Sequence, residues 1–277
     1  ITRLIEMFDL DDEYLPPEVP NIDPNLSIKP NNLLFPHQAR IKKQFNEMLH
    51  NNNRLIIHMP TGSGKTRTCL EGVFDYLKTF KNRNFFIVWL AHSQELCEQA
   101  LETIMNVWEN KGDENLNVYK MWGNNEPSIN FNKGGLIITS YQKLHAMRMS
   151  RKDRDFGIIN NIKQKCQMVI TDEAHRVIAS TFLASIEFIS DIDDTKIIGL
   201  TATPGRGLNH EENIRLSNFF NDKKISITDQ DDNPLDDPVN FLQEQGYLSK
   251  IKAKEVPTNF TYNLNGEDLQ NLKDGFD

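Results

Sequence analysis

Two short stretches of the sequence carry residues that could do chemistry together. The first is Pro60-Thr61-Gly62-Ser63-Gly64-Lys65-Thr66, which follows the apolar run 55–57. Glycines allow a close backbone approach that a Cβ would block, so the N–H groups of such a turn can point at phosphate oxygens. Lys65 could reach the outer phosphates of a nucleotide, and the Thr66 hydroxyl could ligate a divalent cation. The stretch has Met59 where the general phosphate-loop pattern has its first glycine, so it is a shorter variant.

The second stretch is Asp172-Glu173-Ala174-His175, which follows the apolar run 168–171. A nucleotide–magnesium site needs a carboxylate at the end of a neighbouring strand. Asp172 would hold Mg²⁺ together with Thr66, and Glu173 would activate the attacking water as a general base. His175 could couple the nucleotide to another site. An isolated Asp-Glu pair is commonly a solvated pair, but here it follows a buried strand, so we predict Lys65, Asp172 and Glu173 as the catalytic group.

The elements that must position these residues alternate along the chain from Phe35 onward. A helix is expected after Lys65 and another over Gln94–Trp108. Short apolar runs predict strands at Arg54–His58, Phe85–Leu90, Asn117–Trp122, Leu136–Thr139, Met168–Thr171 and Lys196–Leu200. The alternation predicts an α/β fold with a parallel sheet and helices on both faces. Ligands of such sheets bind at the carboxyl ends of the strands, where both chemical stretches lie.

Composition shifts predict three segments. Residues 1–34 read as an N-terminal arm or linker, since the stretch 11–32 contains five prolines. Residues 35–228 read as one globular lobe. Residues 229–277 read as an acidic loop over 229–240, followed by a short helical start, a turn at 246–248 and a strand at Ile251–Val256.

The net charge of −8 argues against a nucleic-acid partner, because phosphate contacts need Lys and Arg. The charge is uneven, however, since residues 143–165 hold seven Lys or Arg and two Asp. That stretch could line a nucleic-acid path or form a solvated face, and both interpretations stay open. Three scattered cysteines predict free thiols and a cytoplasmic protein. No apolar run approaches the roughly 20 residues of a membrane span, so we expect no membrane partner.

With both stretches described, the chain resembles the first RecA-like lobe of a superfamily 2 DExH/DEAH-box helicase. That resemblance implies a P-loop NTPase with three α/β/α layers. Residues 60–66 match the first motif of the family, residues 172–175 match the second, and Leu200-Thr201-Ala202-Thr203-Pro204 matches the third. The third motif couples nucleotide state to the nucleic-acid site, which implies that role for Thr201 and Thr203. Within the superfamily the chain looks most like type I/III restriction-type (ResIII) and XPB-like helicases.

The resemblance implies further binding residues. Gln38 stands upstream of the phosphate loop, where the family carries a glutamine that reads adenine, although a surface glutamine is the alternative. His92 and Ser93 fall in a segment similar to the family's motif Ia, and Thr139 and Ser140 in one similar to motif Ib. Both motifs touch the nucleic-acid backbone in the family. Many members have proline at the position of His92.

The function implied is the ATP-binding lobe of a nucleic-acid-dependent ATPase, a helicase or translocase of restriction, repair or anti-phage defence. ATP and Mg²⁺ would be its cofactors. Its partners would be nucleic acid, DNA in preference to RNA, a second RecA-like lobe of the same parent chain, and a nuclease or defence subunit. The isolated lobe would hydrolyse ATP weakly, because it lacks the arginines of the second lobe. The alternative is a P-loop ATPase that remodels proteins without nucleic acid; such proteins share the first two motifs but not Gln38 or the third.

Overall fold

The computed structural model describes residues 32–190, 195–202 and 210–250. The chain divides into two units, Ile1–Leu34 and Phe35–Asp277. In the second unit seven strands form one sheet in the order β3-β4-β2-β5-β6-β1-β7, and every neighbouring pair is parallel. The strands are β1 (Arg54–His58), β2 (Phe86–Ala91), β3 (Val118–Met121), β4 (Gly135–Ser140), β5 (Cys166–Asp172), β6 (Lys196–Thr201) and β7 (Lys224–Ser226).

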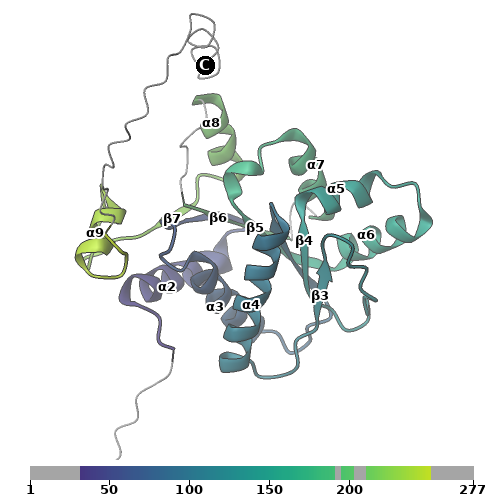
Figure 1. Ribbon diagram of the computed structural model, residues 1–277, viewed down its shortest axis with the longest axis horizontal. Coiled ribbons are helices and arrows are strands. Elements are labelled where there is room, and N and C mark those ends of the chain that lie inside the picture. Colours follow the sequence, from purple (N-terminus) through teal and green to yellow (C-terminus); the bar gives the residue numbers. More distant parts are fainter. Residues whose placement is uncertain (1–31, 191–194, 203–209, 251–277) are drawn as a thin grey trace, which may run out of the picture. The chain divides into compact units, whose positions relative to one another are not determined.

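Helices cover both faces of this sheet (Figure 1). One face packs against α2 (Pro36–Asn51), α3 (Lys65–Leu77) and α4 (Gln94–Lys111), and the other against α5 (Tyr141–Met149), α6 (Asp153–Lys165), α7 (Ser180–Ile189) and α8 (His210–Phe219). The central strands β2 and β6 are buried at every residue, as expected for a parallel sheet between two helical layers. The predicted three-layer α/β/α architecture is confirmed.

The six strands predicted from apolar runs are all present; β1 has the predicted bounds, and the bounds of the others differ by at most two residues. The strand expected at Asn117–Trp122 is limited to Val118–Met121, and the helix from Gln94 extends three residues past Trp108 to Lys111. The sequence did not reveal β7, because three residues beside β1 carry too little pattern.

The acidic stretch 229–240 is not entirely a loop. The helix α9 (Pro238–Glu244) begins inside it, because the Asp237 side chain accepts hydrogen bonds from Val239 N at 3.1 Å and Asn240 N at 3.0 Å. Leu242 of α9 is fully buried in the core shared with α2, α3 and α4. The predicted turn follows at Gly246, and the strand predicted at Ile251–Val256 lies outside the described residues.

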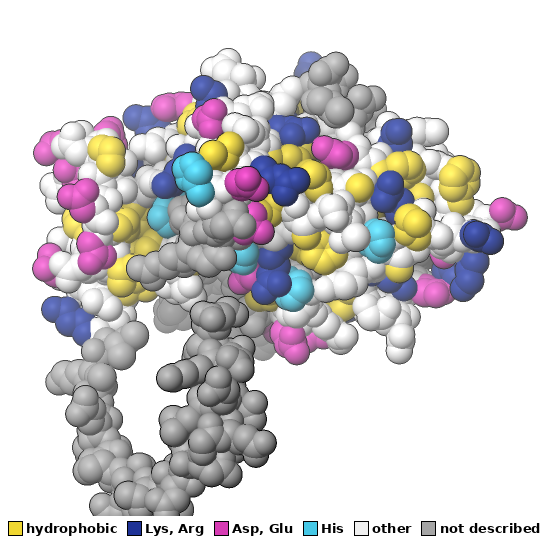
Figure 2. Space-filling view, turned by 90° about the horizontal axis from the view of Figure 1, so that it is seen from above, with side chains coloured by type: hydrophobic (Ala, Val, Ile, Leu, Met, Phe, Trp, Pro, Cys, Tyr) yellow, Lys and Arg dark blue, Asp and Glu magenta, His cyan; other side chains and the backbone are white. Residues whose placement is uncertain are grey.

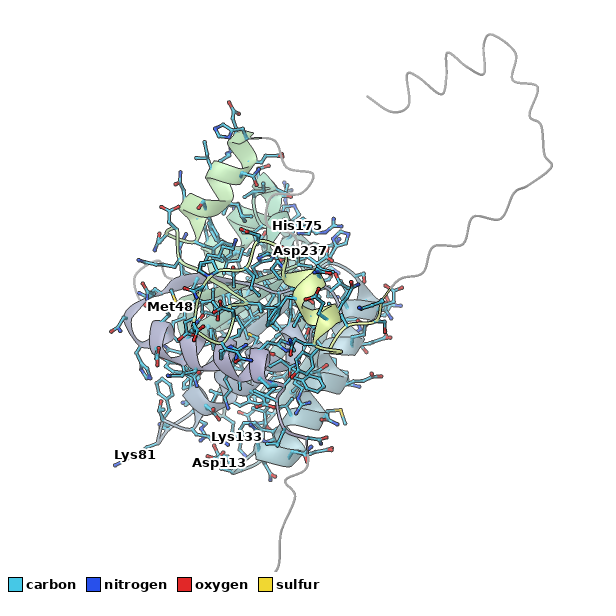
Figure 3. The ribbon with its side chains drawn as sticks, turned by 90° about the vertical axis from the view of Figure 1, so that its left-hand side faces the viewer. Met48, Lys81, Asp113, Lys133, His175 and Asp237 are labelled. Carbon is cyan, nitrogen blue, oxygen red and sulfur yellow. The ribbon has the colours of Figure 1, made fainter. Side chains whose placement is uncertain are left out.

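Because all strands run in parallel, their carboxyl ends form one edge of the sheet, here called the carboxyl edge. Figure 3 shows His175, which follows β5, toward the upper end of the molecule and Lys81, Asp113 and Lys133 at the opposite end. Among the described residues, none of the helices has the length and apolar character that crossing a membrane requires.

Candidate nucleotide site at the carboxyl edge

The phosphate loop connects β1 to α3, and its backbone conformation depends on two glycines. Gly62 has φ +79° and Gly64 has φ +86°, both in the left-handed region that side chains disfavour. A Cβ at Gly64 would lie only 2.2 Å from Gln38 Nε2. Gly64 is the N-cap of α3, so the first N–H groups of the helix face the loop. Ser63 is buried, and its hydroxyl donates to the Pro60 carbonyl at 2.6 Å. This closed turn at a helix N-terminus fits the phosphates of a nucleotide.

Gln38 braces the phosphate loop. Its Nε2 donates to the Ser63 carbonyl at 2.9 Å, and its Oε1 accepts from Phe35 N at 3.0 Å. The His37 Nε2 atom lies 3.2 Å from the same Ser63 carbonyl. Gln38 is 4% exposed, so it is not the surface glutamine of the alternative interpretation. Its contact with adenine stays a prediction, and the structure adds a role in holding the loop.

Lys65, Asp172 and Glu173 are brought together from elements that are distant in sequence. Lys65 is the first residue of α3, and Asp172 is the last residue of β5. Burial lowers the pKa of the Lys65 ammonium, while the charges of Asp172 and Glu173 raise it. Burial likewise raises the pKa of the Asp172 carboxyl, and a hydrogen bond from Glu173 N and the charge of Lys65 act in the opposite direction. Lys65 and Asp172 are half-buried, whereas the Glu173 side chain is 42% exposed. Interacting charges with pKa values shifted by burial are typical of a catalytic site.

Glu173 occupies a conformation that non-glycine residues rarely adopt, with φ +54° and ψ +57°. Its Oε2 atom lies 3.1 Å from Arg176 Nε and 3.7 Å from His175 Nε2. Sequence reasoning missed Arg176, although a charge of opposite sign three residues after the glutamate was the available signal. In the described structure the carboxylate predicted as the general base is therefore paired with an arginine.

His175 is the last residue of the second motif and interacts with Glu173 and with His92, the residue after β2. Burial lowers the pKa of His175, the charge of Glu173 raises it, and Arg176 and His92 lower it further. The Nδ1 atoms of His92 and His175 are both buried without a hydrogen-bond partner in the described part of the chain. The predicted coupling residue thus lies beside the predicted general base and interacts electrostatically with a residue of the segment similar to motif Ia.

The third motif attaches directly to the strand before the phosphate loop. Thr201 ends β6 and is buried, and its carbonyl accepts from Met59 N at 3.0 Å. The His58 Nε2 atom lies 3.1 Å from the Ala202 carbonyl. These backbone contacts join the two motifs that the resemblance assigns to nucleotide binding and to coupling. Thr203 lies outside the described residues.

The predicted nucleic-acid contacts lie at two further helix starts on the carboxyl edge. Ser93 caps α4 by accepting from Leu96 N at 3.3 Å, and Ser140 caps α5 by accepting from Lys143 N at 3.1 Å. Thr139 is buried at the end of β4, and His92 is half-buried after β2. Hydroxyls and helix N-termini can bind phosphates with little positive charge. Figure 2, seen from the upper end to which His175 belongs, shows acidic, basic and histidine side chains interspersed.

A second residue that sequence reasoning missed is Tyr247. Its ring centroid lies 4.9 Å from that of Phe35 and 5.0 Å from that of His37. The next residue, Leu248, approaches the phosphate loop at Gly62, where a Cβ would lie 3.3 Å from Leu248 Cδ2. The segment after α9 therefore folds back onto the loop. The sequence indicated only a turn here, and an aromatic residue directly after its glycine was the only signal.

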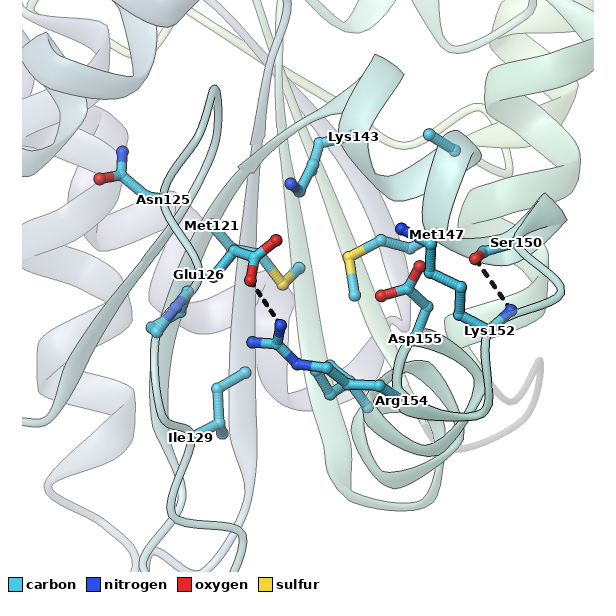
Figure 4. A pocket seen from close by; sticks show the side chains of 13 residues that line it. Met121, Asn125, Glu126, Ile129, Lys143, Met147, Ser150, Lys152, Arg154 and Asp155 are labelled. Atoms are coloured by element: carbon cyan, nitrogen blue, oxygen red, sulfur yellow. Dashed lines mark hydrogen bonds and ion pairs between the residues drawn. The ribbon is translucent and has the colours of Figure 1, made fainter.

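The basic stretch 143–165 lines one side of a separate cavity of about 250 Å³ (Figure 4). The cavity lies between the loop after β3 and the helices α5 and α6, and its lining includes Met121, Glu126, Lys143, Met147, Lys152 and Arg154. Arg154 forms an ion pair with Glu126, and the Arg148 guanidinium lies 5.9 Å from the centroid of the Phe188 ring. Arg151 and Lys152 are exposed. Arg154 and Arg148 of this stretch thus have side-chain contacts with the protein, whereas Arg151 and Lys152 face solvent.

A parallel sheet with a phosphate loop after β1 and paired carboxylates after β5 defines a P-loop nucleotide-binding domain. The chain matches the family model described as "Type III restriction enzyme, res subunit" over residues 32–206, more than half of its length, and it belongs to that family. Membership implies ATP binding.

The relatives agree with this assignment. The chain is 28% identical over 214 residues to the "General transcription and DNA repair factor IIH helicase/translocase subunit XPB" of Enterocytozoon bieneusi (strain H348). The match covers 76% of the chain and 32% of that subunit, so the chain spans about a third of this relative.

Two solved structures share the fold. The helicase domain of Pyrococcus furiosus Hef has a TM-score of 0.51 at 20% identity, covering 71% of this chain and 39% of that one. The Sulfolobus solfataricus SWI2/SNF2 ATPase core in complex with dsDNA has a TM-score of 0.50 at 14% identity, covering 72% and 45%. The chain therefore shares the RecA-like fold of these helicase and ATPase cores.

Proposed function

We propose that the chain is the ATP-binding lobe of a nucleic-acid-dependent ATPase that moves along DNA. One observation carries the proposal: the charge of Lys65 interacts with those of Asp172 and Glu173 at the carboxyl edge, and Lys65 directly follows a glycine loop at a helix N-terminus. A lysine and a helix N-terminus favour phosphate, and a carboxylate pair favours a metal ion and an activated water.

The roles of the residues follow from their positions. The loop Pro60–Gly64 would bind phosphate oxygens through its N–H groups, and Lys65 would neutralise their charge. Thr66 and Asp172 would hold Mg²⁺, and Glu173 would accept a proton from the attacking water. When bound, ATP–Mg²⁺ supplies the electrophilic phosphorus. Because Arg176 now pairs with Glu173, the glutamate must leave that ion pair, at least in part, before it can act as a base.

DNA is the track that we favour. Two relatives support it: one is called a DNA repair helicase/translocase subunit, and one neighbouring structure contains dsDNA. Hydrogen-bond donors for DNA phosphates lie on the same edge as the nucleotide site, at Ser93, Ser140 and the starts of α4 and α5. Such donors need little positive charge, so they partly offset the argument against nucleic acid from the net charge of −8.

Other parts of the parent protein belong to the proposal. We infer an N-terminal arm over 1–34, the ATP-binding lobe over 35–228, and a bridge over 229–277 toward a second RecA-like lobe. A nuclease or defence subunit would be a further partner. A cytoplasmic location is supported by three buried, unpaired thiols at Cys69, Cys97 and Cys166.

The test is ATP hydrolysis by the full-length protein without nucleic acid and with single-stranded DNA, double-stranded DNA or RNA. We expect double-stranded DNA to raise the rate most. Robust hydrolysis that no polymer changes would support the alternative, a protein-remodelling ATPase, which the family and the XPB relative do not favour.

A further inference from the structure

We propose that Tyr141 is a positioning residue for Glu173, and that it links the predicted nucleic-acid contact at Ser140 to the hydrolytic site. The Tyr141 hydroxyl donates a hydrogen bond of 3.1 Å to the backbone carbonyl of Asp172. The two residues follow β4 and end β5, strands that are not neighbours because β2 lies between them. The hydroxyl therefore spans the end of one strand to reach the carboxylate turn.

This hydrogen bond holds one end of the peptide unit that orients Glu173. The carbonyl of that unit belongs to Asp172 and accepts from Tyr141, and its N–H belongs to Glu173 and donates to Asp172 Oδ1 at 3.0 Å. The left-handed conformation of Glu173 begins at this peptide. Since such a conformation persists only where the surroundings fix it, the two hydrogen bonds determine where the Glu173 carboxylate is presented.

Tyr141 is itself rigidly placed. The side chain is 1% exposed, and its ring stacks on Phe182 of α7 with centroids 4.9 Å apart and planes 24° apart. Burial raises the pKa of the Tyr141 phenol, so the hydroxyl keeps the proton that it donates. A rigid ring with a single donor transmits small displacements well, because packed side chains have little room to relax.

The other end of the link is the start of α5. Tyr141 follows Ser140 directly, and Ser140 caps the helix through Lys143 N. If a phosphate binds at Thr139 and Ser140, a shift of this helix start moves the Tyr141 hydroxyl and with it the Asp172–Glu173 peptide. This part of the inference rests on the proposed function, whereas the positioning of Glu173 does not.

The experiment is the substitution Tyr141→Phe in the full-length protein, which removes the hydroxyl and keeps the stacked ring. We expect kcat for ATP to fall about two- to tenfold, the effect of one lost hydrogen bond, while KM stays within about twofold. Stimulation by DNA should fall by a similar factor. In a Glu173→Gln background, Tyr141→Phe should have no further effect on kcat.

The matched control is Tyr119→Phe. Tyr119 is a buried tyrosine of β3 whose hydroxyl accepts from Asn130 N at 3.2 Å, at a place without contact to Asp172. The Tyr119→Phe variant should leave kcat and the stimulation by DNA unchanged. An unchanged kcat in Tyr141→Phe, or equal losses in both variants, would overturn the positioning role. If no polymer stimulates the unmodified protein but Tyr141→Phe still lowers kcat at constant KM, positioning stands and the nucleic-acid function fails.

Discussion

At the residue scale, the site combines two half-buried charges with a strained backbone at Glu173. Lys65 and Asp172 both have pKa values shifted by burial toward the neutral form, and each is partly stabilised by the charge of the other. Glu173 adds a backbone conformation that few residues tolerate. Such features cost stability, and proteins retain them where activity requires them.

Asp172→Asn should make the protein more stable while abolishing its activity. The pKa of Asp172 is raised in the folded state, so the stability contributed by its protonated carboxyl is fully present below the unfolded pKa near 4 and is lost as pH rises through the folded pKa. At neutral pH its charge is unfavourable. We expect Asn to increase Tm at pH 7 by about 2–4 °C, corresponding to about 1 kcal/mol, as measured by calorimetry.

The matched control is Asp113→Asn at the opposite end of the molecule (Figure 3). The Arg83 guanidinium lowers the pKa of Asp113 to about 2, so its contribution is present above the unfolded pKa and is lost as pH falls toward 2. This variant should lower Tm at pH 7 or leave it unchanged. A lower Tm for Asp172→Asn than for the unmodified protein would contradict the account.

At the element scale, helix starts at the carboxyl edge are joined to one another. The first turn of α2 braces the phosphate loop before α3 through Gln38, and the segment after α9 closes on the same loop through Tyr247 and Leu248. The loop conformation is therefore set by two other parts of the chain as well as by its own glycines.

Gln38→Ala should raise KM for ATP by about tenfold, because the Ser63 carbonyl and the Phe35 N–H lose their amide partner. Steady-state kinetics with ATP and GTP separate two roles of the side chain. An equal rise of KM for both nucleotides indicates bracing of the loop, and a larger rise for ATP adds recognition of adenine. An unchanged KM for both would show that Gln38 serves neither role.

The helices α5 and α6 carry the next prediction. Since Arg154 and Arg148 have protein contacts, Arg151 and Lys152 are the cations free to meet DNA. The double change Arg151→Glu, Lys152→Glu should weaken duplex binding and lower the salt slope by about 2, at roughly 0.9 per phosphate contact, measured by anisotropy over a salt series.

Lys81→Glu with Lys133→Glu is the control for that prediction, since it changes the same number of charges at the far end of the molecule (Figure 3). It should leave the slope unchanged. Equal salt slopes for both double variants would show that residues 143–165 form a solvated surface and do not contact DNA.

At the scale of the whole molecule, the fold could be predicted because its signals are local. Buried parallel strands give apolar runs, and the phosphate loop gives glycines at fixed spacing. The contacts that complete the site were not predictable in this way. The hydrogen bond from Tyr141 to Asp172 joins residues 31 positions apart in sequence. The rings of Phe35 and Tyr247 are in contact although the two residues stand near opposite ends of the described sequence. Those pairings depend on sheet order, which short-range patterns do not encode.

The start of helix α9 and the strand β7 were not predicted from the sequence. Asp237 and Pro238 are turn-forming residues, but an aspartate N-cap followed by proline is also a local helix start, and Leu242 of this helix is buried in the core. Strand β7 exists because β1 offers it an edge. Strand β7 therefore depends on tertiary pairing, whereas the start of α9 was encoded locally and was missed.

The central claim, that this lobe uses Glu173 to hydrolyse ATP in response to DNA, is tested most directly with Glu173→Gln in the full-length protein. ATP binding and hydrolysis would be measured with and without double-stranded DNA. The account predicts that the unmodified protein is stimulated, and that the variant binds ATP normally but hydrolyses it at least about 100-fold more slowly in both conditions, because an amide cannot accept the proton. DNA-stimulated hydrolysis at the normal rate in Glu173→Gln would contradict it.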